Sequence, residues 1–285
     1  MSELYRKYGI RKRDLEFISS EDATAIEIIR DRMNWKGKLG FGLEYKKYAY
    51  RLDRFYKKAL KEKACYYGPF KGEFGHFLLH NLPFLMHLHA KGVAIHYCGM
   101  KLHKPFLVDE QGNSLVESFV ELRDFFGEIK PSANQNEVPA DVQKKIDQWR
   151  KKAEKSGLPF LDIDQTDFYW HGLRNWQLEG KQKRYNLSKV YGPEKADSVV
   201  IFPRRKGGAA TPNNGKAWDY MKVAETLSPL FEKVYLVGHP SLSASVESKG
   251  NIEVKVSADN ADTLKYCSEA QLIVTQHSGA VHLRA

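Results

Sequence analysis

Strand-like and helix-like segments alternate along this chain, and this alternation limits the possible folds more than any other feature. In the last third, two segments have helical spacing, KAWDYMKVAETLSPLF and ADTLKYCSEA, and four apolar runs lie around them: DSVVIFP, KVYLVG, NIEVKV and QLIVTQ. Strands that alternate with helices form parallel sheets covered on both faces. The sequence therefore predicts an α/β fold.

The middle of the chain has the same texture. From residue 63 we expect strands at KACYYG and VAIHYC, a short strand at KPFLVD, and helices at HFLLHNLPFLMHLHAKG and SLVESFVELRDFFG. PADVQKKIDQWRKKAEKSG predicts another helix, with Pro139 in its first turn and an Asp141–Lys145 pair spaced four residues apart. Its apolar stripe consists of Val142, Ile146, Trp149 and Ala153.

Changes in the residue pattern divide the chain into three parts. We expect a basic helical extension over 1–62, a first β/α domain with its linker over 63–190, and a second β/α domain over 191–285. The most economical architecture is two Rossmann-like parallel domains that face a cleft, with a helical extension at the N-terminus.

Composition narrows the class of protein. Hydrophobic residues make up 42% of the 285 residues and charged residues 28%, which is typical of a globular chain. We expect a cytoplasmic protein, because the basic start is followed by no apolar signal segment and HFLLHNLPFLMHLHA is too short and polar to span a bilayer. The three cysteines are widely separated, which favours reduced, buried thiols over disulfides or a zinc site. The net charge of +10 suits nucleic acid, an anionic membrane surface or phosphorylated small molecules, and by itself selects none of them.

Two segments of the second domain are suited to bind phosphate. The strand at 272–275 leads into a turn and the start of a helix, where the amides of Ser278, Gly279 and Ala280 would point at an anion. The Gly-rich loop after DSVVIFP carries Arg204, Arg205 and Lys216 and would face the same sheet edge. The alternatives are an ordinary turn with Ser278 as N-cap, and solvated surface cations.

Residues 198–285 resemble the donor-binding domain of GT-B glycosyltransferases, most closely the heptosyltransferase-like type. The resemblance is carried by the order and spacing of Lys216-Ala217-Trp218, of VYLVG ending at Gly238, and of Ser278-Gly279-Ala280-Val281-His282-Leu283. It implies that the lysine and the turn from His277 to His282 hold the diphosphate of a nucleotide sugar. His277 stands where the family usually has an acid. The family's domain continues beyond the point that corresponds to Ala285, so we expect this copy of the domain to be incomplete.

The first domain carries a candidate acceptor loop. GPFKGEFGHFLLHNLP resembles the Gly-acid turn of these enzymes, which implies that Glu73, between Gly72 and Gly75, is the general base; His76 is a second candidate. The resemblance then implies an inverting, metal-independent transfer of a sugar to a glycan or lipid-linked acceptor, with no cofactor besides the nucleotide sugar. Peripheral association with the inner face of a membrane fits such an acceptor. Alternatively, Glu73 caps the next helix or pairs with Lys71.

Other features point to different functions. Asp162-Ile163-Asp164 matches the DxD sequence of metal-dependent transferases. The aromatic and basic segment DFYWHGLRNWQ could stack against a sugar or a base, but we expect it to fill the interface between the two domains. A nucleic-acid-binding or DNA-modifying protein would use the basic surface, but the sequence contains no recognition motif for nucleic acid. A nucleotide-sugar epimerase and a pyruvyl transferase are further GT-B-shaped alternatives.

Overall fold

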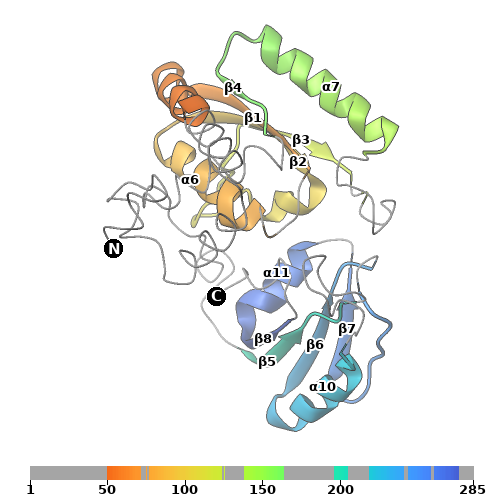
Figure 1. Ribbon diagram of the computed structural model, residues 1–285. Coiled ribbons are helices and arrows are strands. Elements are labelled where there is room, and N and C mark those ends of the chain that lie inside the picture. Colours follow the sequence, from red (N-terminus) through yellow and green to blue (C-terminus); the bar gives the residue numbers. More distant parts are fainter. Residues whose placement is uncertain are drawn as a thin grey trace, which may run out of the picture.

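The strands of this protein form two separate four-stranded sheets (Figure 1). Every strand pair in both sheets is parallel. The computed structural model describes residues 50–71, 75, 77–123, 125, 138–163, 196–204, 218–240, 243–257 and 260–275, apart from the side chains of Leu79, His80 and Asn260. The α/β class is confirmed, and so is the predicted division of the strands between two sheets.

Both sheets repeat one strand order. The first is ordered β3-β2-β1-β4 and the second β7-β6-β5-β8, so in each the third, second, first and fourth strands along the chain lie side by side. This is the order of the first four strands of a Rossmann sheet.

The first sheet and its helices occupy the chain from residue 50 to residue 161. A helix over 50–62 precedes the first strand. The other elements are β1 (Ala64–Phe70), the π-helical turn η1 (Phe77–Asn81), α6 (Leu82–Ala90), β2 (Ala94–Met100), the 3-10 helix η2 (Lys101–Phe106), β3 (Ser118–Leu122), α7 (Ala140–Lys155) and β4 (Phe160–Leu161).

Helices cover both faces of the first sheet. Alternate residues of β1 are therefore buried on opposite sides. Tyr67 packs with Phe55 of the helix over 50–62 and with Phe84 of α6. Tyr66 faces the other way, and its ring centroid lies 5.0 Å from that of Trp149 on α7. A central strand that is buried on both faces is typical of a doubly wound sheet.

The prediction for α7 is confirmed in its buried stripe and wrong in its ion pair. Val142, Ile146, Trp149 and Ala153 are all buried. Asp141, however, accepts hydrogen bonds of 2.6 and 2.9 Å from the guanidinium of Arg123, and the amine of Lys145 donates to the carbonyl of Glu121. The partners of both side chains thus lie at the end of β3.

Two other predictions are wrong. Within SLVESFVELRDFFG, residues Ser118–Leu122 form strand β3, which pairs with β2 from His96 to Met100. The open hydrogen-bonding edge of β2 outweighs the helical spacing of this segment. KPFLVD contributes to η2 rather than to a strand, because Pro105 lacks the amide that a strand ladder needs.

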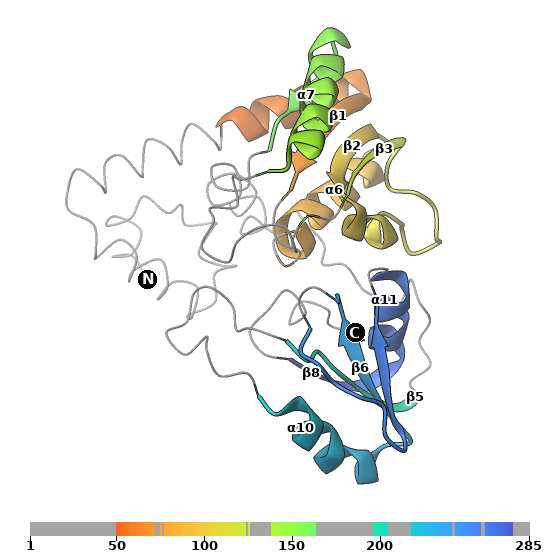
Figure 2. The same ribbon diagram turned by 90° about the vertical axis from the view of Figure 1, so that its right-hand side faces the viewer.

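The second sheet has the same two-sided burial. Its elements are β5 (Ala196–Ile201), α10 (Tyr220–Leu227), the 3-10 helix η4 (Ser228–Leu230), β6 (Lys233–Gly238), β7 (Ile252–Val256), α11 (Asn260–Glu269) and β8 (Ala270–Val274). Val199 belongs to the cluster that contains Ala224 of α10, whereas Val200 belongs to the cluster that contains Leu264 and Cys267 of α11. Figure 2 shows α10 and α11 on opposite faces of this sheet.

The two halves of the molecule meet where α11 contacts η2. Leu264 and Cys267 of α11 belong to the same buried cluster as Phe106 of η2. Because η2 follows the carboxyl end of β2, this contact fixes α11 beside the carboxyl edge of the first sheet. Among the described helices, none has both the length and the apolar character needed to cross a membrane.

Candidate functional site

The strand order defines where a ligand is expected in each sheet. The first strand of each half lies between the second and the fourth strands. The chain therefore continues toward one edge of the sheet from the first strand to the third, and returns to the other side of the first strand for the fourth. In open parallel sheets, ligands bind outside the carboxyl ends of the strands at such a switch point. The candidate positions are therefore the ends of β1 and β4 in the first sheet, and of β5 and β8 in the second.

In the second sheet, the segments after β5 and β8 leave the sheet as neighbours. Ile201 pairs with Val274, and the amide of Phe202 donates to the carbonyl of Val274 at 3.0 Å. Arg204, two residues further on, is partly buried and forms an isolated antiparallel bridge with Ser243. Arg204 thus follows the carboxyl end of β5, where the segment after β6 pairs with it.

The segment after β6 folds back against the same edge. Gly238 ends β6 with a φ of +151°, and a Cβ atom there would lie 2.7 Å from the hydroxyl oxygen of Ser243. That hydroxyl donates to the carbonyl of His239 at 2.9 Å. Glycine is therefore favoured at position 238, because L side chains rarely adopt this backbone conformation and a Cβ atom would also displace the Ser243 hydroxyl.

Two aromatic residues stand at the start of α10. Tyr220 is buried, and its burial raises the pKa of its hydroxyl, an effect that the neighbouring Arg204 opposes. Trp218 is 48% exposed, and its ring centroid lies 6.1 Å from that of Tyr220. Trp218 thus leaves a flat apolar surface available near the end of β5.

Most of the predicted donor-side residues lie outside the described residues. They are Arg205, Lys216, His277, Ser278, Gly279, Ala280 and His282. The expectation that the amides of the turn face the cationic loop therefore stays a prediction.

In the first sheet, the acceptor loop is described only at its borders. Gly75 is buried and helical, whereas Gly72, Glu73 and His76 lie outside the described residues. Phe70 and Phe77, on either side of this loop, both pack against the ring of His103 in η2, with centroid distances of 5.5 and 4.0 Å. The chain thus enters and leaves the acceptor loop beside His103.

His103 is a buried, neutral imidazole. Its Nδ1 accepts a hydrogen bond of 3.1 Å from the amide of Met100 and lies 3.0 Å from the hydroxyl of Tyr97. Burial lowers the pKa of His103 well below 6.5, so the imidazole is neutral. Because Nδ1 accepts the bond from Met100, the one ring proton is on Nε2. This Nε2–H has no hydrogen-bond partner among the described residues.

His103 did not emerge from the sequence as a site residue, although one signal was present. It stands three residues after Met100, the last residue of β2, and polar residues just beyond the carboxyl end of a parallel strand are candidates for function. The same rule would have found His239 and Ser243 after β6.

The alternative metal sites gain no support from the described residues. Asp162, the first acid of the Asp162-Ile163-Asp164 sequence, accepts a hydrogen bond of 2.8 Å from Arg150. Within the described ranges, no three His, Cys, Asp or Glu side chains gather closely enough to hold a metal ion.

Comparison of the chain with protein-family models, with curated proteins and with solved structures found no match.

Proposed function

We propose that this protein is an inverting glycosyltransferase of the GT-B type, which transfers a sugar from a nucleotide-sugar donor to a glycan or lipid-linked acceptor in the cytoplasm. In this proposal the two Rossmann-like halves face each other across a cleft. The second half binds the donor and the first half binds the acceptor.

The observation that carries the proposal is the repeated strand order with its two switch points. In the second sheet, β8 lies beside β5, so the Arg204 loop and the turn after residue 275 start from adjacent positions. A diphosphate between them would meet guanidinium groups from one side and backbone amides from the other. The resemblance of residues 198–285 to GT-B donor domains supports the same assignment.

Each candidate residue has a role in the transfer. Arg204, Arg205 and Lys216 neutralise the leaving diphosphate, and the amides of Ser278, Gly279 and Ala280 bind its oxygens as charge develops. His277 and His282 flank this turn and contact the donor. These groups supply the charge stabilisation that a metal ion supplies in other transferases, so no metal is needed. Trp218 stacks on the base or sugar of the donor.

On the acceptor side, Glu73 removes the proton from the attacking hydroxyl. Gly72 and Gly75 let the backbone of this loop approach the acceptor closely, and His76 is the alternative base. An in-line attack opposite the leaving diphosphate inverts the configuration at the anomeric carbon.

The donor half of the proposal is tested by calorimetry with UDP, GDP and ADP sugars. The full chain should bind one of these donors, and Lys216→Ala should weaken that binding by about tenfold or more, because a charge-assisted contact to phosphate is lost. Unchanged binding by Lys216→Ala, or binding of no donor, would contradict the donor site.

The acceptor half is tested separately by donor hydrolysis and transfer assays. Glu73→Gln should reduce turnover by about 10²- to 10⁴-fold while donor affinity stays nearly constant. Wild-type turnover in this variant would move the base to His76 or elsewhere. Release of an epimerised sugar or use of phosphoenolpyruvate would instead identify one of the other GT-B-shaped enzymes.

A further inference from the structure

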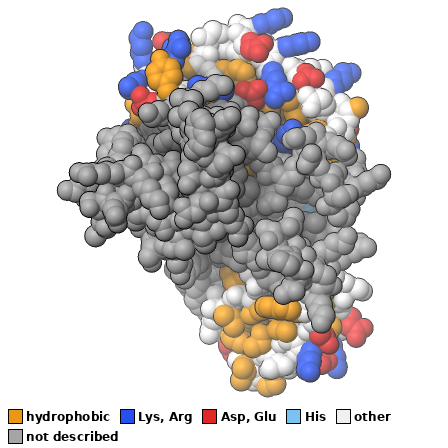
Figure 3. All heavy atoms as spheres, in the orientation of Figure 1, with side chains coloured by type: hydrophobic (Ala, Val, Ile, Leu, Met, Phe, Trp, Pro, Cys, Tyr) orange, Lys and Arg blue, Asp and Glu red, His pale blue; other side chains and the backbone are white. Residues whose placement is uncertain are grey.

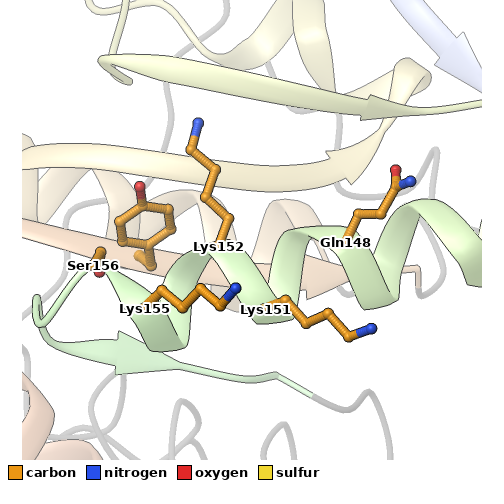
Figure 4. A pocket seen from close by; sticks show the side chains of 6 residues that line it. Gln148, Lys151, Lys152, Lys155 and Ser156 are labelled. Carbon is orange, nitrogen blue, oxygen red and sulfur yellow. The ribbon is translucent and has the colours of Figure 1, made fainter.

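A second candidate site lies on α7, away from both switch points. An open cavity of about 580 Å³ is lined by Tyr66, Gln148, Lys151, Lys152, Lys155 and Ser156 (Figure 4). In this view Lys151 and Lys155 extend along one side of the helix, and Lys152 and Gln148 extend to the other side. Three of the six lining side chains are cations and none is an acid.

Three carboxylates on or beside α7 have arginine partners. Asp141 is bound by Arg123, and Asp147 and Asp162 both lie within 4 Å of the guanidinium of Arg150. The lysines that line the cavity have no ion pair among the described residues. These three acids are therefore bound by arginines, and Glu154 of the same helix forms no ion pair with the cavity lysines, which are available to an external anion.

The position of these lysines near the end of the helix explains only in part why cations occur there. Lys152 and Lys155 stand in the last turn of α7, where cations interact favourably with the helix dipole. Lys151 and Lys155, however, are four residues apart on one exposed stripe, where like charges repel each other and destabilise a helix. An anion between them would relieve this repulsion.

The cavity is distant from the proposed transfer site along the sheet. Because α7 connects two parallel strands, it runs back from the carboxyl edge, and its C-terminal half lies toward the amino edge. Tyr66 belongs to the amino-terminal half of β1. Figure 3 shows Lys and Arg side chains gathered over α7 and over the helix at 50–62 on this part of the molecule.

We propose that the cavity lined by Lys151, Lys152 and Lys155 is a binding site for a phosphate-bearing anion. Three ammonium groups offer up to nine N–H donors, which suits the several acceptor oxygens of a phosphate or diphosphate. Either a soluble phosphate compound or the phosphate headgroup of a lipid can supply this chemistry. The site is independent of the glycosyl donor site, and neither assignment needs the other.

The test compares the full chain with three charge-reversal variants. Lys152→Glu and Lys155→Glu place an acid at the cavity. Lys144→Glu is the matched control, because Lys144 is an exposed lysine of the same helix that does not line the cavity. All four proteins are measured in the Lys216→Ala background, which removes the proposed donor contact. Circular dichroism and thermal unfolding establish that each variant is folded.

Two probes distinguish the sources of phosphate. Pyrophosphate binding is measured by calorimetry, and lipid binding by co-sedimentation with phosphatidylcholine vesicles that do or do not contain phosphatidic acid. We expect at least one probe to bind, and both cavity variants to weaken its binding by about tenfold to hundredfold, while Lys144→Glu leaves binding unchanged.

Two results would overturn the proposal. The first is no binding of either probe to the parent protein. The second is equal weakening by Lys144→Glu and by the cavity variants, because that would indicate general attraction to a basic surface. Tighter binding of a single-stranded oligonucleotide, weakened equally by all three variants, would have the same meaning and would favour a nucleic-acid surface.

Discussion

The guanidinium of Arg150 donates a hydrogen bond of 2.8 Å to a carboxylate oxygen of Asp162, and this pair joins α7 to the segment after β4. A second nitrogen of Arg150 lies 3.4 Å from the other carboxylate oxygen of Asp162. Asp162 is the first acid of the Asp162-Ile163-Asp164 sequence that matches a metal-binding pattern. In the folded chain it serves instead to hold a helix against the sheet.

Asp162→Asn should therefore behave as a mildly destabilising substitution. Both side chains of the pair are about one-third exposed, so solvent screening limits the loss to about 1 kcal/mol of unfolding free energy, measured in urea. Transfer activity should be the same for the variant and the parent chain, with manganese or with EDTA. Activity that depends on manganese in the parent and is lost in Asp162→Asn would restore the metal hypothesis.

Gly68 should tolerate no side chain. Its φ is +115°, and a Cβ atom would lie 2.4 Å from the carbonyl oxygen of Cys98, which belongs to the neighbouring strand β2. Gly68→Ala should therefore force β1 and β2 apart and lower the free energy of unfolding by about 3 kcal/mol or more.

Gly92→Ala is the matched control for Gly68→Ala. Gly92 has a φ of +69°, and a Cβ atom there would meet nothing within 4 Å, so only the strain of a left-handed backbone remains. We expect a loss of about 1 kcal/mol in urea unfolding. Equal losses for the two variants would mean that the close approach to Cys98 has little energetic weight.

The sequence predicted correctly those elements whose buried residues follow only one repeat, that of a helix or that of a strand. The stripe of α7 repeats every three to four residues, and β5 and β6 are continuous apolar runs, so each pattern allowed one interpretation. The segment of β3 allowed two, because Phe119, Val120 and Leu122 fit a helix as well as a short strand. The choice between them depends on the free edge of β2, which is a tertiary property.

The same distinction applies to the candidate site. The position of Arg204 at the sheet edge could be predicted, because it follows directly from the end of a parallel strand. The environment of His103 could not, because it depends on how η2 turns the imidazole back toward Met100 and Tyr97. The lack of an ion pair at the three lysines that line the cavity on α7 could not be predicted either, since it depends on which cations bind the nearby acids.

The three cysteines should be unreactive in the folded protein. Cys65, Cys98 and Cys267 are buried, and burial raises the pKa of each thiol to about 12. At pH 8 only on the order of 10⁻⁴ of each thiol would be ionised, and the thiolate is the reactive form. Ellman's reagent should therefore label the native chain very slowly and label all three thiols in guanidinium. Rapid labelling of one thiol in the native chain would show that its side chain is accessible.

The buried imidazole of His103 should make stability depend on pH. Burial keeps the pKa of His103 in the folded chain well below the value of 6.5 that it has when exposed. As the pH falls below about 6.5, the unfolded chain therefore binds a proton that the folded chain does not, and this favours unfolding. The contribution of His103 to the free energy of unfolding is thus complete above pH 7 and decreases toward pH 5, by up to about 1.4 kcal/mol per pH unit.

His103→Asn isolates this contribution, because the side-chain amide oxygen of asparagine can take the place of Nδ1 and accept the hydrogen bond from Met100, while the side chain binds no proton. Urea unfolding at pH 8, 7, 6 and 5 should give a shallower loss of stability below pH 7 for the variant than for the parent chain. Above pH 7 the imidazole is neutral in both states, so the two proteins should there differ by a constant amount. If both proteins lose stability equally between pH 7 and pH 5, then His103 is protonated in the folded chain and cannot be the neutral N–H donor beside the acceptor loop.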